Sequence, residues 1–281
     1  MSYKTIAVWL DPQRRAPVDA ALALATTFDA HVTALNHVDL LRVPSPVRLY
    51  LGEQFDQAWR ARAEAAAGAA AAAFEAAAQR AGRSSIEVRQ LSGDLVQALD
   101  LSARYADLVV MGQVDPYTVE NGRDGDFPDQ VILTCGRPVL LIPYVFADGA
   151  SLPAQDGHAL IAWSATREST RAVIDALPLL QRAREVTVMT LNARPAAEGH
   201  GALPGADIAL YLARHGVTVN VRNEETAGVD AGAMLLSRVA DLSADLLVMG
   251  AYGHSRLREL VLGGVTRTVL REMTVPVLLS H

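Results

Sequence analysis

The chain has 281 residues, a formal net charge of −6 and 51% apolar residues, enough to fill the cores of two ordinary domains. It contains no run of about 18 apolar residues and no basic leader followed by an apolar stretch. We therefore expect neither a membrane span nor secretion, and we expect the protein to be cytoplasmic. A single cysteine, Cys135, excludes an intramolecular disulfide framework, and the acidic balance without a basic tract argues against nucleic-acid binding.

Short apolar runs alternate with helical segments along the chain. In the first half the expected strands lie at 5–10, 31–38, 86–91, 107–111 and 138–142, and the expected helices lie at 16–28, in an alanine-rich tract ending near residue 80, and at 95–105. In the second half the expected strands lie near 159–163, 186–191, 217–221, 245–249 and 275–279. Short apolar strands between helices are typical of a parallel sheet covered on both faces, so we predict an α/β fold.

Two segments of the sequence recur at one spacing. The run DLVVMG at 107–112 returns as DLLVMG at 245–250, and PVLL at 138–141 returns at 276–279, so both recur 138 residues later (245 − 107 and 276 − 138). Two matches at the same offset indicate one domain used twice in tandem. We therefore predict a first domain at 1–145, a linker at 146–157 and a second domain at 158–281.

The residues that carry chemistry follow the strand near 245–249 of the second domain. They are, in chain order, Met249, Gly250, Gly253, His254, Gly263, Gly264, Val265 and Thr266. Glycines let the backbone approach an anion closely, and the N–H groups and dipole of a helix start supply positive potential. The pattern of strand, glycine loop and helix start therefore predicts a phosphate-binding loop, at the strand ends where open α/β sheets bind ligands. His254 either contacts the phosphate or is an exposed loop side chain.

This loop resembles that of the universal stress protein family, whose nucleotide-binding members carry G-x2-G-x9-G followed by Ser or Thr. Gly250, Gly253 and Gly263 match the glycines without a gap, whereas Gly264 stands at the place of the hydroxyl residue. The loss of a hydroxyl contact to phosphate costs roughly 1–3 kcal/mol, which weakens binding without forbidding it. Thr266, two residues further on, is a candidate substitute.

The resemblance also implies the fold. We expect two tandem, doubly wound five-stranded parallel-sheet domains of the Rossmann-like, adenine nucleotide alpha hydrolase-like type. One-domain relatives form dimers through their last strand, so the resemblance implies an intramolecular pseudo-dimer through 139–141 and 277–279, with or without further homodimerisation.

Family members that bind ATP carry Asp after their first strand and contact the base near the end of their second strand. In the second domain these places fall to Trp163, Ser164, Ala165 and Leu191. Ser164 can form a hydrogen bond to a ribose or base but lacks the two acceptor oxygens of a carboxylate. Trp163 fits a core or pocket-wall position better than a stacking position. The first domain keeps the acidic residue as Asp11.

The two domains differ in the loop itself. At the 138-residue offset Asp115 replaces Gly253, Gly125 keeps the place of Gly263, and Asp126 replaces Gly264. Two carboxylates at a phosphate cradle repel a polyphosphate, so we expect no nucleotide in the first domain. Asp115, Asp124 and Asp126 could alternatively hold a divalent cation. We favour a solvated acidic loop over such a cation site, and we predict no metal site.

These patterns lead to two hypotheses of function. The first is a stress-response or signalling module that binds ATP, ADP or AMP, with or without Mg²⁺, in its second domain only. The alternative, which Gly264 and Ser164 favour, is a tandem pseudo-dimer that acts as a protein interaction module without nucleotide. The sequence has no G-x-S-x-G elbow, no H-E-x-x-H and no paired Cys/His spacing, so we expect no enzyme and no catalytic residues, while slow incidental ATP hydrolysis stays open.

Overall fold

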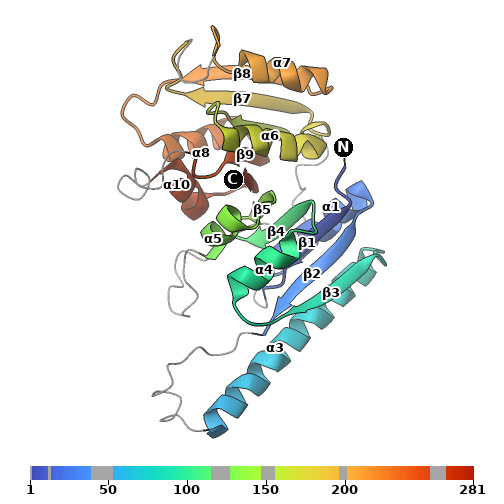
Figure 1. Cartoon of the computed structure of the whole chain (residues 1–281). Coiled ribbons are helices and arrows are strands. Elements are labelled where there is room, and N and C mark those ends of the chain that lie inside the picture. The colour runs from blue at the N-terminus through green and yellow to red at the C-terminus, as the bar shows by residue number, and fades with distance from the viewer. Residues whose placement is uncertain are drawn as a thin grey trace.

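The structure is a computed structural model that describes residues 2–11, 14–38, 53–114, 127–146, 156–195, 201–253 and 264–281 (Figure 1). The strands of the first half are β1 (Thr5–Trp9), β2 (His31–His37), β3 (Ile86–Leu91), β4 (Leu108–Gly112) and β5 (Val139–Ile142), and its helices are α1 (Ala16–Phe28), α3 (Glu53–Arg80), α4 (Leu95–Ala103) and α5 (Phe127–Thr134). The strands of the second half are β6 (His158–Ala162), β7 (Glu185–Leu191), β8 (Val219–Glu224), β9 (Leu246–Gly250) and β10 (Val277–Ser280), and its helices are α6 (Arg167–Leu180), α7 (Ala206–Arg214), α8 (Ala231–Asp241) and α10 (Val265–Glu272).

The ten strands of the described residues form one sheet in the order β3-β2-β1-β4-β5-β10-β9-β6-β7-β8. Neighbouring strands are parallel within each half, and β5 and β10 join the halves as an antiparallel pair. The 138-residue spacing relates Leu140 to Leu278, and these two residues face each other in that pair. The predicted α/β fold with two five-stranded parallel sheets is therefore confirmed, and the last strands join the sheets about an approximate two-fold axis.

The antiparallel join fixes where ligands can bind. Because β5 and β10 run in opposite directions, the carboxyl ends of the strands lie at one edge of the sheet in the first half and at the opposite edge in the second half. Helices α1, α3, α6 and α7 pack on one face of the sheet, and α4, α5, α8 and α10 pack on the other. The fold therefore offers two separate candidate sites, one at each edge.

The two halves also contact each other on the face that carries α1 and α6. The hydroxyl of Tyr3 donates a hydrogen bond to the carbonyl of Asp175 at 2.7 Å, and the guanidinium of Arg182 lies 5.6 Å from the ring centre of Phe28. The halves are thus joined by side chains as well as by the strand pair.

Helix α3 is the longest helix, with 28 residues against nine in α7, its counterpart in the second half. It contains the alanine-rich tract and extends beyond the edge of the sheet in Figure 1. Among its residues of described burial, the buried ones are Ala67, Phe74, Ala77 and Ala78, all in the half nearer its C-terminus. No helix in the described part of the chain is both long enough and apolar enough to cross a membrane.

One strand begins later than its sequence predicts. We expected a strand at 217–221, whereas β8 begins at Val219. Gly216 has φ +80°, the N–H of Val217 donates to the carbonyl of Leu212, and the N–H of Gly216 donates to that of Ala213. These two bonds form a Schellman motif, so the buried Val217 closes α7 and does not open the strand.

Candidate functional site

The candidate site of the second half begins where β6 passes into α6. Thr166 caps the helix: its hydroxyl accepts a hydrogen bond from the N–H of Ser169 at 3.3 Å, and the hydroxyl of Ser169 accepts one from the N–H of Thr166 at 3.1 Å. Ser164 joins this capping box, because its Oγ lies 3.2 Å from Oγ1 of Thr166. Ala165 makes the turn between them with φ +55°. Two hydroxyl groups therefore lie together at the carboxyl end of β6.

Gly250 ends the neighbouring strand β9 against this helix start. A Cβ atom on Gly250 would lie 2.4 Å from the backbone N of Ser169 and 2.6 Å from the carbonyl carbon of Glu168. Both are backbone atoms that cannot move aside without shifting the helix. The first glycine of the motif is therefore required by the packing of β9 on α6, whether or not a ligand is bound.

Gly253 brings the loop after β9 back to the same place. A Cβ there would lie 3.0 Å from Oε2 of Glu168 and 3.1 Å from Oγ1 of Thr166. The side chain of Glu168 is only 9% exposed, and its Oε1 accepts a hydrogen bond from Nη2 of Arg167 at 3.0 Å. Burial acts to raise the pKa of Glu168, but hydrogen bonds from its own backbone, from Arg167 and from Thr166 outweigh it and lower the pKa below its ordinary value. An ionised carboxylate therefore borders the loop at neutral pH.

Helix α10 follows this loop in the chain. Its N-cap is Gly264, with φ −58° and ψ 158°, an ordinary extended conformation that any residue can adopt. Among the described residues, no side chain caps the N-terminus of this helix. Thr266 is 2% exposed, and its Oγ1 accepts a hydrogen bond from the N–H of Tyr252 at 3.4 Å. The hydroxyl of Thr266 is thus hydrogen-bonded to the backbone at Tyr252.

The structure describes four of the remaining residues that the sequence predicted for the site. Trp163 is partly buried and packs against the core on the face that carries α1 and α6, and Leu191 packs on the opposite face of the sheet. Met249 is buried, and Val265 packs against the same core. His254 and Gly263 lie outside the described residues.

Sequence reasoning did not select Thr166 or Glu168. The signal for Thr166 was available, because Thr-x-x-Ser shortly after an apolar strand is a variant of the capping-box pattern. Glu168 could not be found in this way. Its importance comes from the approach of β9, which lies about 80 residues further along the chain.

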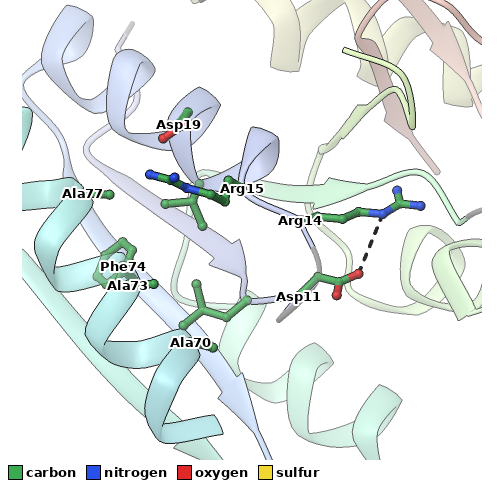
Figure 2. Close-up of a pocket in the computed structure, with 10 residues that line it drawn as sticks. Asp11, Arg14, Arg15, Asp19, Ala70, Ala73, Phe74 and Ala77 are labelled. Carbon is green, nitrogen blue, oxygen red and sulfur yellow. Dashed lines mark ion pairs between the residues drawn. The ribbon is translucent and has the colours of Figure 1, made fainter. Parts of the chain in front are cut away.

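The equivalent edge of the first half is filled differently. Asp11 follows β1, and its carboxylate lies 3.9 Å from Nε of Arg14. Figure 2 shows Arg14 turned towards Asp11, while Arg15 extends the other way beside α3. Between α1 and α3 lies a cavity of about 50 Å³, walled by residues that include Val18 and Phe74, which is far below the roughly 300–1,000 Å³ of drug-sized ligand pockets.

Arg14 also covers the end of β4. Its Nη1 donates a hydrogen bond to the carbonyl of Gln113, and its guanidinium lies 4.3 Å from the ring centre of Tyr144. A Cβ on Gly112, the counterpart of Gly250, would lie 3.2 Å from Nη1 of Arg14. A side chain therefore stands in the first half where the first turn of α6 stands in the second. Asp115, Asp124, Gly125 and Asp126 lie outside the described residues, and within the described ranges no three His, Cys, Asp or Glu residues form a metal-binding group.

Comparison with known proteins finds relatives of this chain in both sequence and fold. A model of the universal stress protein family matches residues 2–143 and 157–281 of the chain. A universal stress protein of Synechocystis sp. is 30% identical to it over 204 residues, which are 71% of this chain and 67% of that protein. The crystal structure of a universal stress protein from Archaeoglobus fulgidus has a TM-score of 0.70 at 16% identity, over 98% of this chain and 95% of that one. That of a putative universal stress protein from Pseudomonas aeruginosa has a TM-score of 0.60 at 15% identity, over 99% of this chain and 93% of that one.

Proposed function

The chain belongs to the universal stress protein family, and we propose that it binds one adenine nucleotide at the carboxyl edge of its second half, as a ligand-responsive module in a stress response. The observation that carries this proposal is the arrangement of β9, its glycine loop and α10. Gly253 lies against the first turn of α6, and the start of α10, whose N-terminus no described side chain caps, is joined to Tyr252 by the hydrogen bond to Thr266. Backbone N–H groups and a helix dipole are the features that bind phosphate in such loops.

The hydroxyl groups at the end of β6 are the proposed partners of the ribose or the base of the nucleotide. Ser164 and Thr166 can each donate to or accept from a ribose or a base. The charge of Glu168 opposes phosphate, and its ion pair with Arg167 offsets part of that opposition. We propose ATP, ADP or AMP as the ligand, with or without Mg²⁺. We propose no nucleotide in the first half, because Arg14 covers the end of β4 there.

We propose binding and not turnover as the activity. Hydrolysis of ATP needs a group that positions or deprotonates the attacking water and a clamp on the phosphate charge. Glu168 borders Gly253, and its lowered pKa makes it a weak base at neutral pH.

One observation favours the second candidate, a protein interaction module without nucleotide. Gly250 is explained by packing alone, because a Cβ there meets the backbone of α6 in any state of the site. Part of the glycine motif would therefore persist in a chain that binds no ligand.

Isothermal titration of the full chain with ATP separates these candidates. The wild-type chain is expected to bind with a micromolar or weaker dissociation constant. Gly253→Asp places a second carboxylate beside Glu168 and should abolish binding, while Gly253→Ala, the steric control, should weaken it less. If the wild-type chain binds no adenine nucleotide, the interaction module becomes the better account. Equal loss in both variants would show that space, and not charge, decides the site.

A further inference from the structure

Gln113 links the first half to the helix that starts at the proposed nucleotide site. It follows β4 at the carboxyl edge of the first half and is 5% exposed. Its Nε2 donates hydrogen bonds to the carbonyls of Leu270 at 2.9 Å and Arg271 at 3.0 Å, both in α10 of the second half. Its Oε1 accepts a hydrogen bond from the N–H of Tyr144 at 2.7 Å. Because both ends of the amide are engaged, its orientation is fixed.

The two carbonyls need such a donor. The last four carbonyls of an α-helix have no partner within the helix, and Leu270 and Arg271 belong to the last turn of α10, which ends at Glu272. Gln113 thus caps the C-terminus of α10 from the other half of the chain. At its other end the helix is tied to the glycine loop by the bond between Thr266 and Tyr252.

The antiparallel join of the sheets makes this cap possible. It places the C-terminal end of α10 at the carboxyl edge of the first half, and the N-terminal end at the carboxyl edge of the second. The helix has eight residues and so spans about 12 Å between the two edges. A shift at one end of so short and rigid an element moves the other end.

The cap itself is held by the first half. The N–H of Gln113 donates to the carbonyl of Ile142 at 2.8 Å, and its carbonyl accepts the hydrogen bond from Arg14. The second half has no equivalent glutamine, although its Arg171 donates a hydrogen bond at 3.1 Å to the carbonyl of Gly136, two residues beyond the end of α5. The residue 138 positions after Gln113 is Ala251, which has no side-chain donor for the C-terminus of α5.

We propose that Gln113 is a positioning residue of the nucleotide site in the second half. By fixing the C-terminus of α10, it sets where the helix start at Gly264 lies relative to Tyr252 and Gly253. The first half therefore serves the ligand site of the second half without contacting the ligand. The proposal rests on the proposed function, because it requires that the start of α10 receives the phosphates.

The test is Gln113→Glu in the full chain. This change keeps the shape of the side chain but turns the donor amide into a carboxylate that faces two carbonyl oxygens and the negative end of the helix dipole. Gln113→Met removes the donors without adding charge. We expect the dissociation constant for ATP to rise about three- to tenfold in Gln113→Glu and less in Gln113→Met, where tenfold corresponds to about 1.4 kcal/mol.

A matched control separates positioning from stability. Thr187→Val removes the hydroxyl that lies 2.9 Å from Nε2 of the buried His158, and this pair is between β6 and β7, away from α10. All chains are titrated well below their melting temperatures, so that a loss of stability alone leaves the dissociation constant unchanged. Thr187→Val should then bind ATP as the wild type does. Amide hydrogen exchange in α10 should be faster in Gln113→Glu than in the wild type or in Thr187→Val.

The outcomes are distinct. If Gln113→Glu melts at a lower temperature but binds ATP with the wild-type dissociation constant, Gln113 is a structural residue only and the positioning proposal is overturned, while the proposed function stands. If the wild-type chain binds no ATP, the proposed function fails first. Weaker binding in Thr187→Val, of the same size as in Gln113→Glu, would also overturn the proposal.

Discussion

The glycines at the ends of β4 and β9 allow a direct comparison of the two halves. Gly112 and Gly250 are equivalent by the 138-residue repeat, and neither has a positive φ, so alanine fits the backbone at both. Their surroundings differ. A Cβ on Gly250 meets backbone atoms at 2.4 and 2.6 Å, whereas a Cβ on Gly112 meets side-chain atoms of Arg14 and Pro17 at 3.2–3.3 Å.

These distances predict different costs for the same substitution. Replacing glycine by alanine stabilises a chain by about 0.4–1 kcal/mol through the unfolded state where no strain arises. Added atoms in a packed region cost about 1–3 kcal/mol, and more where the backbone must move. Gly250→Ala should therefore lower the free energy of unfolding by about 2 kcal/mol or more. Gly112→Ala should change it by less than about 1 kcal/mol in either direction, because the side chains of Arg14 and Pro17 need to shift by only a few tenths of an ångström.

Urea unfolding of both variants and of the wild type measures these differences, with the slope of the unfolding free energy checked for equality between chains. The variant Gly250→Ala should also bind ATP more weakly, because α6 and the loop move apart. If both variants are equally stable, or if Gly112→Ala is the less stable of the two, the close packing of β9 on α6 is not as the structure has it, and the site built on it must be revised.

Three further substitutions test the site and its surroundings. Gly264→Ser fits the extended backbone and should stabilise α10 by a few tenths of a kcal/mol as an N-cap. It should also tighten ATP binding by up to roughly tenfold. If the stability of the chain and its dissociation constant for ATP are both unchanged, this position faces no phosphate. Glu168→Gln removes the carboxylate beside the loop and should tighten ATP binding about two- to fivefold, more than AMP binding; weaker binding on titration would show that the carboxylate contacts the ligand. Burial raises the pKa of Asp175, whose carboxylate accepts a hydrogen bond from Ser280 at 2.8 Å. The folded chain therefore holds the Asp175 proton more tightly than the unfolded chain does. As a result, the free energy of unfolding falls as the pH rises from the ordinary pKa of an aspartate through the raised pKa of Asp175. Asp175→Asn should remove that fall and raise the melting temperature at pH 7 relative to the wild type; an unchanged pH profile of the melting temperature would contradict this.

The sequence predicted the parts of the fold that local pattern determines. Strands such as β4 and β9 are buried on both faces, so they appear as apolar runs, and their recurrence at one offset predicted the repeat and the fold. The start of β8 was misplaced because Val217 is apolar for a different reason, the closing of α7. Apolar character shows that a residue is buried, but not which element buries it.

The candidate site was predictable only along the chain. Gly250, Gly253 and Gly264 follow one another in sequence, so their pattern indicated the loop. Glu168 and Gln113 act across space: the first is brought to the loop by the packing of β9 on α6, and the second reaches a helix 157 residues away. The contact of Gln113 depends on the join between the two halves, and the contact of Glu168 depends on packing within the second half; no local pattern encodes either.

Native mass spectrometry of the full chain, titrated with ATP, tests the central claim most directly. Bound nucleotide shows as added mass, and the number of ligands per chain is counted in the same spectrum. The account predicts one adenine nucleotide per chain at saturation, and none in Gly253→Asp. Two nucleotides per chain would contradict the difference between the halves, and none in the wild type would contradict the nucleotide site itself.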